Sequence, residues 1–229
     1  MIFDKNIYKV SFINRPNRFK AYIYKDEEEL MVHVPNTGRC REILIPGTTV
    51  LLREENNPTR KTKYDLIAGY KGGRLINIDS QIPNKVVEEA LLNKNIQALV
   101  SYNKVEREKT FGNSRFDFKL SGEAGEYYLE VKGVTLEDQG KTMFPDAPTE
   151  RGRKHLLELV EVVRSGRGAG VLFLIQMKAV DSFSPNDAMD KEFGEALRFA
   201  KENGVDIFAY DCDLGENYIT LRQQVKVIL

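Results

Sequence analysis

The sequence contains no tryptophan and only two cysteines, Cys40 and Cys212, which are far apart and form no Cys-x-x-Cys or Cys/His spacing. A disulfide scaffold and a structural zinc site are therefore not expected, and a reducing cytoplasm is the default compartment. No run of about 18 apolar residues occurs, so no membrane-spanning helix is expected. The opening stretch MIFDKNIYKV also lacks the charged-then-apolar pattern of a secretion signal.

The formal net charge is zero, because 34 Lys and Arg balance 34 Asp and Glu. The balance is uneven along the chain: residues 1–80 carry 14 basic against 10 acidic residues, and the remainder carries 20 against 24. An ordinary solvated surface produces such a difference. A polyanionic partner would therefore meet local basic patches rather than a globally basic protein.

Residues 7–80 have the pattern of an all-β domain. Short alternating segments are separated by turn residues such as Gly, Pro and Asn. Five such strands in about 75 residues favour a small closed barrel of the OB-fold kind, whose groove often takes single strands of nucleic acid. The expected strands cover residues 17–25, 29–36, 47–55, 64–72 and 74–80.

After residue 82 the pattern changes to helices interleaved with strands, which predicts an α/β layer domain. Apolar stripes predict helices in 81–96, 150–168 and 190–204, with Asn84 as a plausible cap of the first. The apolar run 169–177 predicts a central strand covered on both faces, and 205–214 a further strand. We therefore expect two domains, residues 1–82 and 83–229.

The stretch SRFDFKLSGEAGEYYLEVKGVTL, residues 114–136, predicts a hairpin that carries two acids and an amine. If the hairpin is symmetric about SGEAGE, Leu120 faces Tyr127 and Asp117 lies opposite Glu130. Opposed side chains have Cβ atoms roughly 4.5–5.5 Å apart, so the two carboxylates would repel each other. A divalent cation between them reverses that effect, and such oxygen ligands suit Mg²⁺.

Lys132 follows on the same face of its strand, where its ammonium could orient a water or neutralise a phosphate. Together the three groups have the equipment for phosphodiester hydrolysis. The alternative is a solvent-exposed face with cross-strand ion pairs, because Arg115 and Lys119 share the face of Asp117 on their strand.

Three further stretches carry candidate nucleic-acid contacts. At the helix entry PTERGRKHLLEL, Thr149 is a good cap, but basic residues crowd the first turn, where the helix dipole disfavours cations. That favours a phosphate-binding role, although His155 could equally be a packing residue, as His33 is expected to be. PNTGR and PTRKTKY are basic loops that suit phosphate contact and base stacking, or are ordinary surface turns. The candidate contacts are Asn36, Arg39, Arg60, Lys61, Lys63, Arg151, Lys154 and His155.

Several stretches taken together resemble the sugar fermentation stimulation protein (SfsA) family over nearly the whole chain. They are VHVPNTGR (32–39), SRFDF (114–118), YLEVKGVTL (128–136), FPDAPTERGRKHLLEL (144–159) and FSPN (183–186). The resemblance implies an N-terminal OB-fold and a C-terminal α/β restriction-endonuclease-like domain of the PD-(D/E)xK type. It also implies DNA binding and a link to regulation of sugar-utilisation genes such as those for maltose.

Carried over to this sequence, the nuclease pattern assigns its two acids to Asp117 and Glu130 and its lysine to Lys132. Phe116 stands where the pattern has proline. The acid of the first helix falls on Glu89 by comparison with the family, although helical geometry alone does not choose between Glu89 and Glu88. The resemblance thus implies an Mg²⁺ or Mn²⁺ site held by Glu89, Asp117 and Glu130.

Two functions follow as hypotheses. The first is a metal-dependent nuclease that acts on DNA, with RNA as an alternative, and has no membrane partner. The second is a non-catalytic DNA-binding transcriptional regulator that retains a nuclease fold. A sugar-binding regulator has no support in the residues, since tryptophan is absent and no stacked-aromatic platform is apparent.

Overall fold

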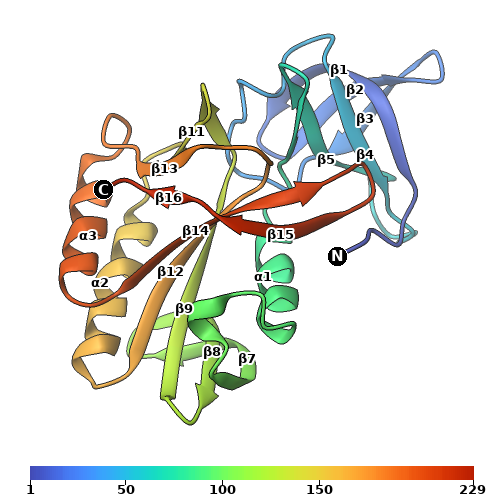
Figure 1. Ribbon diagram of the computed structural model, residues 1–229. Helices are drawn as coiled ribbons and strands as arrows, with labels where there is room; N and C mark the ends of the chain where they lie inside the picture. Colours follow the sequence, from blue (N-terminus) through green and yellow to red (C-terminus); the bar gives the residue numbers. More distant parts are fainter.

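The computed structural model describes residues 1–229 and contains an N-terminal barrel joined to an α/β domain (Figure 1). In the barrel, β1 pairs with both β2 and β4, and a parallel bridge between His33 and Asp65 joins β3 to β5. That pairing closes the sheet on itself, as expected for an OB-fold. The strands are β1 (Ile7–Asn17), β2 (Lys20–Lys25), β3 (Glu28–His33), β4 (Thr49–Glu54), β5 (Tyr64–Lys71) and β6 (Arg74–Asn77).

The second domain is built on a six-stranded sheet in the order β15-β14-β12-β9-β8-β7. The continuous apolar run predicted a central strand, and β12 is one: it is buried along almost its whole length and lies parallel to both β9 and β14. The strands are β7 (Tyr102–Phe111), β8 (Ser114–Gly122), β9 (Gly125–Val134), β12 (Gly168–Ile175), β14 (Asp206–Leu214) and β15 (Ile219–Gln224).

Helices cover both faces of this sheet, and Figure 1 shows α2 and α3 on one side and α1 on the other. Thr149 caps α2 as predicted, because its side chain accepts a hydrogen bond of 3.0 Å from the Gly152 amide. The helices are α1 (Ile82–Leu92), α2 (Glu150–Arg164) and α3 (Lys191–Glu202), with a short 3₁₀ turn at Gln97–Leu99. None of them is long and apolar enough to cross a membrane.

Some elements lie outside the sequence-based expectation. The barrel has six strands rather than five, because residues 7–17 form β1 as a strand of their own. A small four-stranded sheet, β10-β11-β13-β16, was not predicted, since its strands are only two to four residues long. Its strands are β10 (Leu136–Asp138), β11 (Lys141–Phe144), β13 (Ser182–Pro185) and β16 (Lys226–Val227).

The two domains are joined by backbone and side-chain contacts. The amide of Asn77, the last residue of β6, donates to the carbonyl of Gln176 at 3.0 Å. Lys71 and Arg74 of the barrel both pair with Glu137 of the second domain, at 3.1 and 2.8 Å. The barrel is therefore held in one position against the carboxyl ends of β9 and β12.

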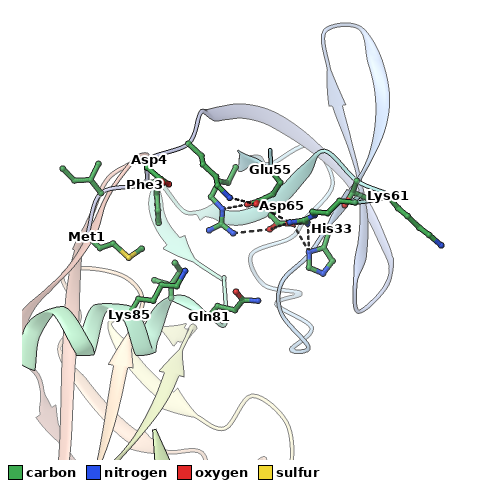
Figure 2. A pocket seen from close by; sticks show the side chains of 15 residues that line it. Met1, Phe3, Asp4, His33, Glu55, Lys61, Asp65, Gln81 and Lys85 are labelled. Carbon is green, nitrogen blue, oxygen red and sulfur yellow. Dashed lines mark hydrogen bonds and ion pairs between the residues drawn. The ribbon is translucent and has the colours of Figure 1, made fainter. Parts of the chain in front are cut away.

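A buried charge cluster lies in the barrel wall next to the start of α1 (Figure 2). Arg53 donates to Glu55, Asp79 and Asp65 at 2.7, 2.9 and 3.2 Å. Asp65 also bonds Arg60 and His33, so His33 is a hydrogen-bonded structural residue. Burial raises the pKa of Asp65, but its bonds to Arg60 and His33 outweigh burial and hold the pKa below its ordinary value.

Replacing Arg53 with alanine is expected to lower the free energy of unfolding by about 3–5 kcal/mol, because two buried carboxylates would lose their shared cation. Asp65 and Asp79 are only 4% and 1% exposed. Urea denaturation followed by circular dichroism measures the change, with Lys61→Ala as a control at an exposed residue without an ion pair. A loss below 1 kcal/mol for Arg53→Ala would contradict the assigned role.

Candidate active site

The β8–β9 hairpin has the predicted pairing near its turn and departs from it further away. Leu120 pairs with Tyr127, as expected, but the turn contains only Glu123 and Ala124 between Gly122 and Gly125. Gly125 has a φ of +97°, which favours glycine at this tight turn. The strand pairing then ends at Phe118 and Leu129, before it reaches the two acids.

The side-chain alternation of β8 breaks at Asp117. Phe116 packs with Tyr128 in the core on the α2 side, whereas Phe118 and Leu120 belong to the core on the α1 side. An uninterrupted strand would place all three on one face. The two strands therefore separate at Asp117, and the simple opposed geometry expected for Asp117 and Glu130 is not formed.

Asp117 fills the space where the strands separate. Its Oδ2 accepts a hydrogen bond from the Val131 amide at 2.8 Å, in place of a backbone partner. Its Oδ1 accepts from the Asn84 side chain of α1 at 2.7 Å. Burial, and then the negative charge of Glu130, raise the pKa of Asp117 above its ordinary value. The carboxylate is thus oriented by two neutral donors but lacks a direct cationic partner.

Glu130 is 4% exposed and has two partners on the same oxygen. Its Oε1 accepts from Lys132 Nζ at 2.6 Å and faces His155 Nδ1 at 2.5 Å. Burial raises the pKa of Glu130, but His155 and Lys132 outweigh it and hold the pKa below its ordinary value. The other oxygen, Oε2, is buried and has no hydrogen-bond partner. A buried carboxylate oxygen without a partner is costly, so Oε2 is the atom of this carboxylate that is free to bind a ligand.

That unpartnered oxygen allows a test of whether the residues fit a divalent cation. Asp117, whose pKa is raised by burial and then by the charge of Glu130, supplies one hard oxygen ligand, and Glu130 Oε2 supplies another. Mg²⁺ takes one or two carboxylates and completes its shell with waters and substrate phosphates. No group of three or more His, Cys, Asp or Glu side chains has metal-holding geometry, so the fit is to a two-carboxylate site of that kind.

The competing interpretation, a solvent-exposed face of ion pairs, is not observed. Arg115 pairs with Glu108 at 3.4 Å, and Lys119 pairs with Glu126 at the far side of the hairpin. Neither base contacts Asp117 or Glu130. The two acids therefore remain available to a ligand, apart from the bonds described above.

The first helix contributes Asn84 rather than the predicted Glu89. Glu89 bonds the amino terminus of the chain at 2.5 Å, and Glu88 pairs with Arg107 at 3.2 Å. A helix turns 100° per residue, so Glu89, five residues beyond Asn84, points about 140° away from Asp117. Asn84 is not the cap either, since α1 begins two residues earlier at Ile82. The predicted set of Glu89, Asp117 and Glu130 is therefore not brought together.

The basic start of α2 divides between two roles. His155 is 5% exposed and bonds Glu130, so it is not a surface phosphate contact. It belongs to one group of buried polar residues, here called the acid cluster: Asn84, Asp117, Glu130, Lys132 and His155. The helical pattern contained a signal for this, because His155 shares the buried stripe of Leu156 and Leu159. Lys154 reaches Glu158 at 3.6 Å, whereas Arg151 is exposed and has no ion-pair partner.

The predicted barrel contacts are also divided. Asn36 is occupied by two hydrogen bonds, since its side chain donates to the carbonyl of Ile78, just after β6, and accepts from the Gly38 amide of its own loop. Arg60 is bound in the Asp65 cluster, and Lys63 pairs with Glu54 at 2.8 Å. Lys61 is exposed and points away from that cluster (Figure 2). These internal bonds leave Arg39 and Lys61 as the free cations among the predicted barrel residues.

Arg39 lies in a basic groove that the sequence analysis did not identify as a unit. Arg15 fixes the loop by donating to the carbonyls of Gly38, Arg39, Arg18 and Asn36. Arg18, Arg39 and Arg41 line an adjoining pocket of about 390 Å³ and have no ion-pair partners. The same three line a larger groove of about 810 Å³. Its other wall is the segment 144–149, which leads into α2.

Two family models match the chain in succession. The first, the SfsA N-terminal OB domain, matches residues 13–78, and the second, the sugar fermentation stimulation protein RE domain, matches residues 81–218. These matches agree with the two folds described above. They confirm the family resemblance seen in the sequence.

Relatives match over the full length. A sugar fermentation stimulation protein homolog from Clostridium kluyveri is 71% identical, and one from Clostridium tetani is 70% identical, each over 230 residues that cover 100% of both chains. The structure of Pyrococcus furiosus SfsA in complex with Ca²⁺ aligns with a TM-score of 0.90 at 28% identity, again over 100% of both chains. The chain therefore belongs to the sugar fermentation stimulation protein (SfsA) family.

Proposed function

We propose that the chain is a phosphodiesterase that cleaves nucleic acid with Mg²⁺ or Mn²⁺, with DNA as the first candidate substrate and RNA as the alternative. The observation that carries this proposal is the buried, unpartnered Oε2 of Glu130. It belongs to a carboxylate whose charge, after burial, raises the pKa of Asp117. Such an arrangement is unfavourable without a cation. The Ca²⁺ complex of the Pyrococcus furiosus relative, which has the same overall fold, supports metal binding in the family.

Each residue of the cluster has a role in this proposal. Asp117 and Glu130 would hold the cation, which when bound polarises a phosphoryl oxygen and lowers the pKa of a bound water. Asn84 and the Val131 amide orient Asp117. His155 and Lys132 share Glu130 Oε1, which leaves Oε2 free as the ligand atom.

Lys132 has a second task. Its ammonium carries three protons, and one serves Glu130, so the others are available to a phosphate oxygen or to the attacking water. A fixed positive charge beside the scissile phosphate stabilises the extra charge that develops in the transition state. The amine therefore acts on the substrate, while His155 acts only by positioning Glu130.

The groove lined by Arg18, Arg39 and Arg41 supplies the binding surface. A guanidinium group without an ion-pair partner can bind two oxygens of one phosphate through two parallel hydrogen bonds. Nucleic-acid affinity comes largely from such phosphate contacts. Thr149, the cap of α2, lines this groove, and α2 carries both exposed Arg151 and the His155 that bonds Glu130. In this proposal a substrate strand bound in the groove would extend from the barrel along the start of α2.

A non-catalytic DNA-binding regulator, of sugar-utilisation genes in particular, is the second candidate. One observation favours it: Glu89 pairs with the amino terminus, so the cluster has two acids where the family pattern suggested three. Under this hypothesis the basic groove has a use, but the unpartnered Glu130 oxygen has none.

Cleavage is tested with labelled single- and double-stranded DNA and RNA in Mg²⁺, Mn²⁺ or EDTA. We expect products only with metal, and a loss of at least about 100-fold in rate for Asp117→Asn and Lys132→Ala. Lys119→Ala, a lysine of the neighbouring strand that pairs with Glu126, is the matched control and should keep full activity. Binding without products in every condition would favour the regulator.

Metal binding should also appear as stability. A cation at 100 times its Kd adds about 2.7 kcal/mol to the free energy of unfolding, and Asp117→Asn should abolish that gain. The pKa of Asp117 is higher in the folded protein than in the unfolded chain. The free energy of unfolding therefore falls as pH rises from the unfolded pKa through the folded pKa, because the ionised carboxylate is unfavourable in the folded state. The metal-free Asn variant should therefore melt at a higher temperature than wild type at pH 7. Equal metal-induced shifts in Tm for both proteins would exclude Asp117 as a ligand.

The groove is tested by replacing Arg18, Arg39 and Arg41 together with alanine. Each lost phosphate contact should reduce the slope of log affinity against log salt by about 0.7 for single strands or 0.9 for duplex. The slope is measured by fluorescence anisotropy between about 50 and 200 mM salt, the range over which affinity from phosphate contacts falls steeply. Arg164→Ala, at the far end of α2, is the control. An unchanged slope in the triple variant would place the nucleic acid elsewhere.

A further inference from the structure

A small cavity of about 150 Å³ lies at the seam between the two domains. It is lined by the ends of β9 and β12, which run parallel and finish side by side at Val134 and Ile175. The barrel loop around Thr37 and Gly38 supplies another wall. The cavity therefore opens at the carboxyl ends of these two strands, where the barrel meets the sheet.

Gln176 is the lining residue of this cavity with a buried polar atom that has no partner. The residue is 2% exposed, and its Oε1 is buried without a hydrogen bond. Its backbone is fixed on two sides, because its amide donates to Val134 at 2.9 Å and its carbonyl accepts from Asn77 at 3.0 Å. A buried amide held in place but left unsatisfied is costly unless a ligand completes its bonds.

Glycine at position 133 keeps the space beside this amide open. A Cβ there would lie 3.2 Å from Gln176 Nε2 and 2.8 Å from Pro83 Cγ. The neighbours in sequence belong to the acid cluster: Lys132 precedes Gly133, and Asn84 follows Pro83. Successive residues of β9 face opposite sides of the sheet, so Lys132 and Gly133 lie on different faces. A nucleic-acid strand that reached both Lys132 and the cavity would therefore cross the carboxyl end of β9.

We propose that this cavity receives one unstacked pyrimidine base of the bound nucleic acid and that Gln176 reads its Watson–Crick edge. A cavity of about 150 Å³ accommodates one benzene-sized ring, which suits a pyrimidine better than a purine. Leu136, Met143 and Phe144 supply apolar surface for the ring. The amide offers one acceptor and two donor hydrogens, which complement the edge of cytosine, thymine or uracil.

This inference rests on the proposed nucleic-acid substrate and adds base selectivity to it. The test measures binding rather than cleavage. Anisotropy in Ca²⁺ compares oligo-dT and oligo-dC with oligo-dA of equal length, for wild type and for Gln176→Met. Wild type should prefer the pyrimidine strands by about tenfold. Gln176→Met, which keeps the side-chain length without its hydrogen bonds, should lose that preference while its affinity for oligo-dA is unchanged.

Controls separate the outcomes. Gln224→Met, an exposed glutamine of β15, should behave as wild type. If Gln176→Met fails to fold, Gly133→Ala tests the same cavity by crowding the amide, and it too should lose the preference. Equal affinity of wild type for all three strands, or a preference that survives in the variants, overturns this inference and leaves the proposed function standing. Absence of binding to every strand in wild type overturns the proposed function with it.

Discussion

The site depends on the point where β8 and β9 separate, because there two carboxylates enter the protein interior with only part of their charge compensated. Glu130 is held by Lys132 and His155 through one oxygen, and Asp117 is held by a backbone amide and Asn84. Neither arrangement satisfies Glu130 Oε2 or offsets the negative charge on Asp117. A bound cation would do both. The arrangement is unfavourable in the metal-free protein and is the one expected of a metal site.

The barrel contributes more than a separate binding module. Its contacts through Lys71, Arg74 and Asn77 fix it over the carboxyl ends of β9 and β12, so its basic loop forms one wall of the groove. Gly38 allows this close approach, because a Cβ there would lie 2.6 Å from Asp146 Oδ2 of the second domain. Binding and chemistry would thus share one surface made by both domains.

Much of this could be predicted from the sequence, and the exceptions have physical reasons. Periodicity identified the central strand β12 and the helix α2, because these follow local rules of burial, and symmetry about the turn identified the Leu120–Tyr127 pairing. The break at Asp117 could not be predicted, since it depends on how α1 and α2 pack on opposite faces of the sheet. For the same reason Asn84 resembled a cap and His155 a surface base. Arg60 and Lys63 look free in the sequence, but their acidic partners come from neighbouring strands.

The most direct measurement is a crystal of the protein soaked in Mn²⁺ and recorded at the manganese absorption edge. We expect one strong anomalous peak between Asp117 and Glu130, with Glu130 Oε2 as a ligand at about 2.1 Å. A crystal with full manganese occupancy elsewhere and none beside Glu130, with Oε2 still unpartnered, would contradict it.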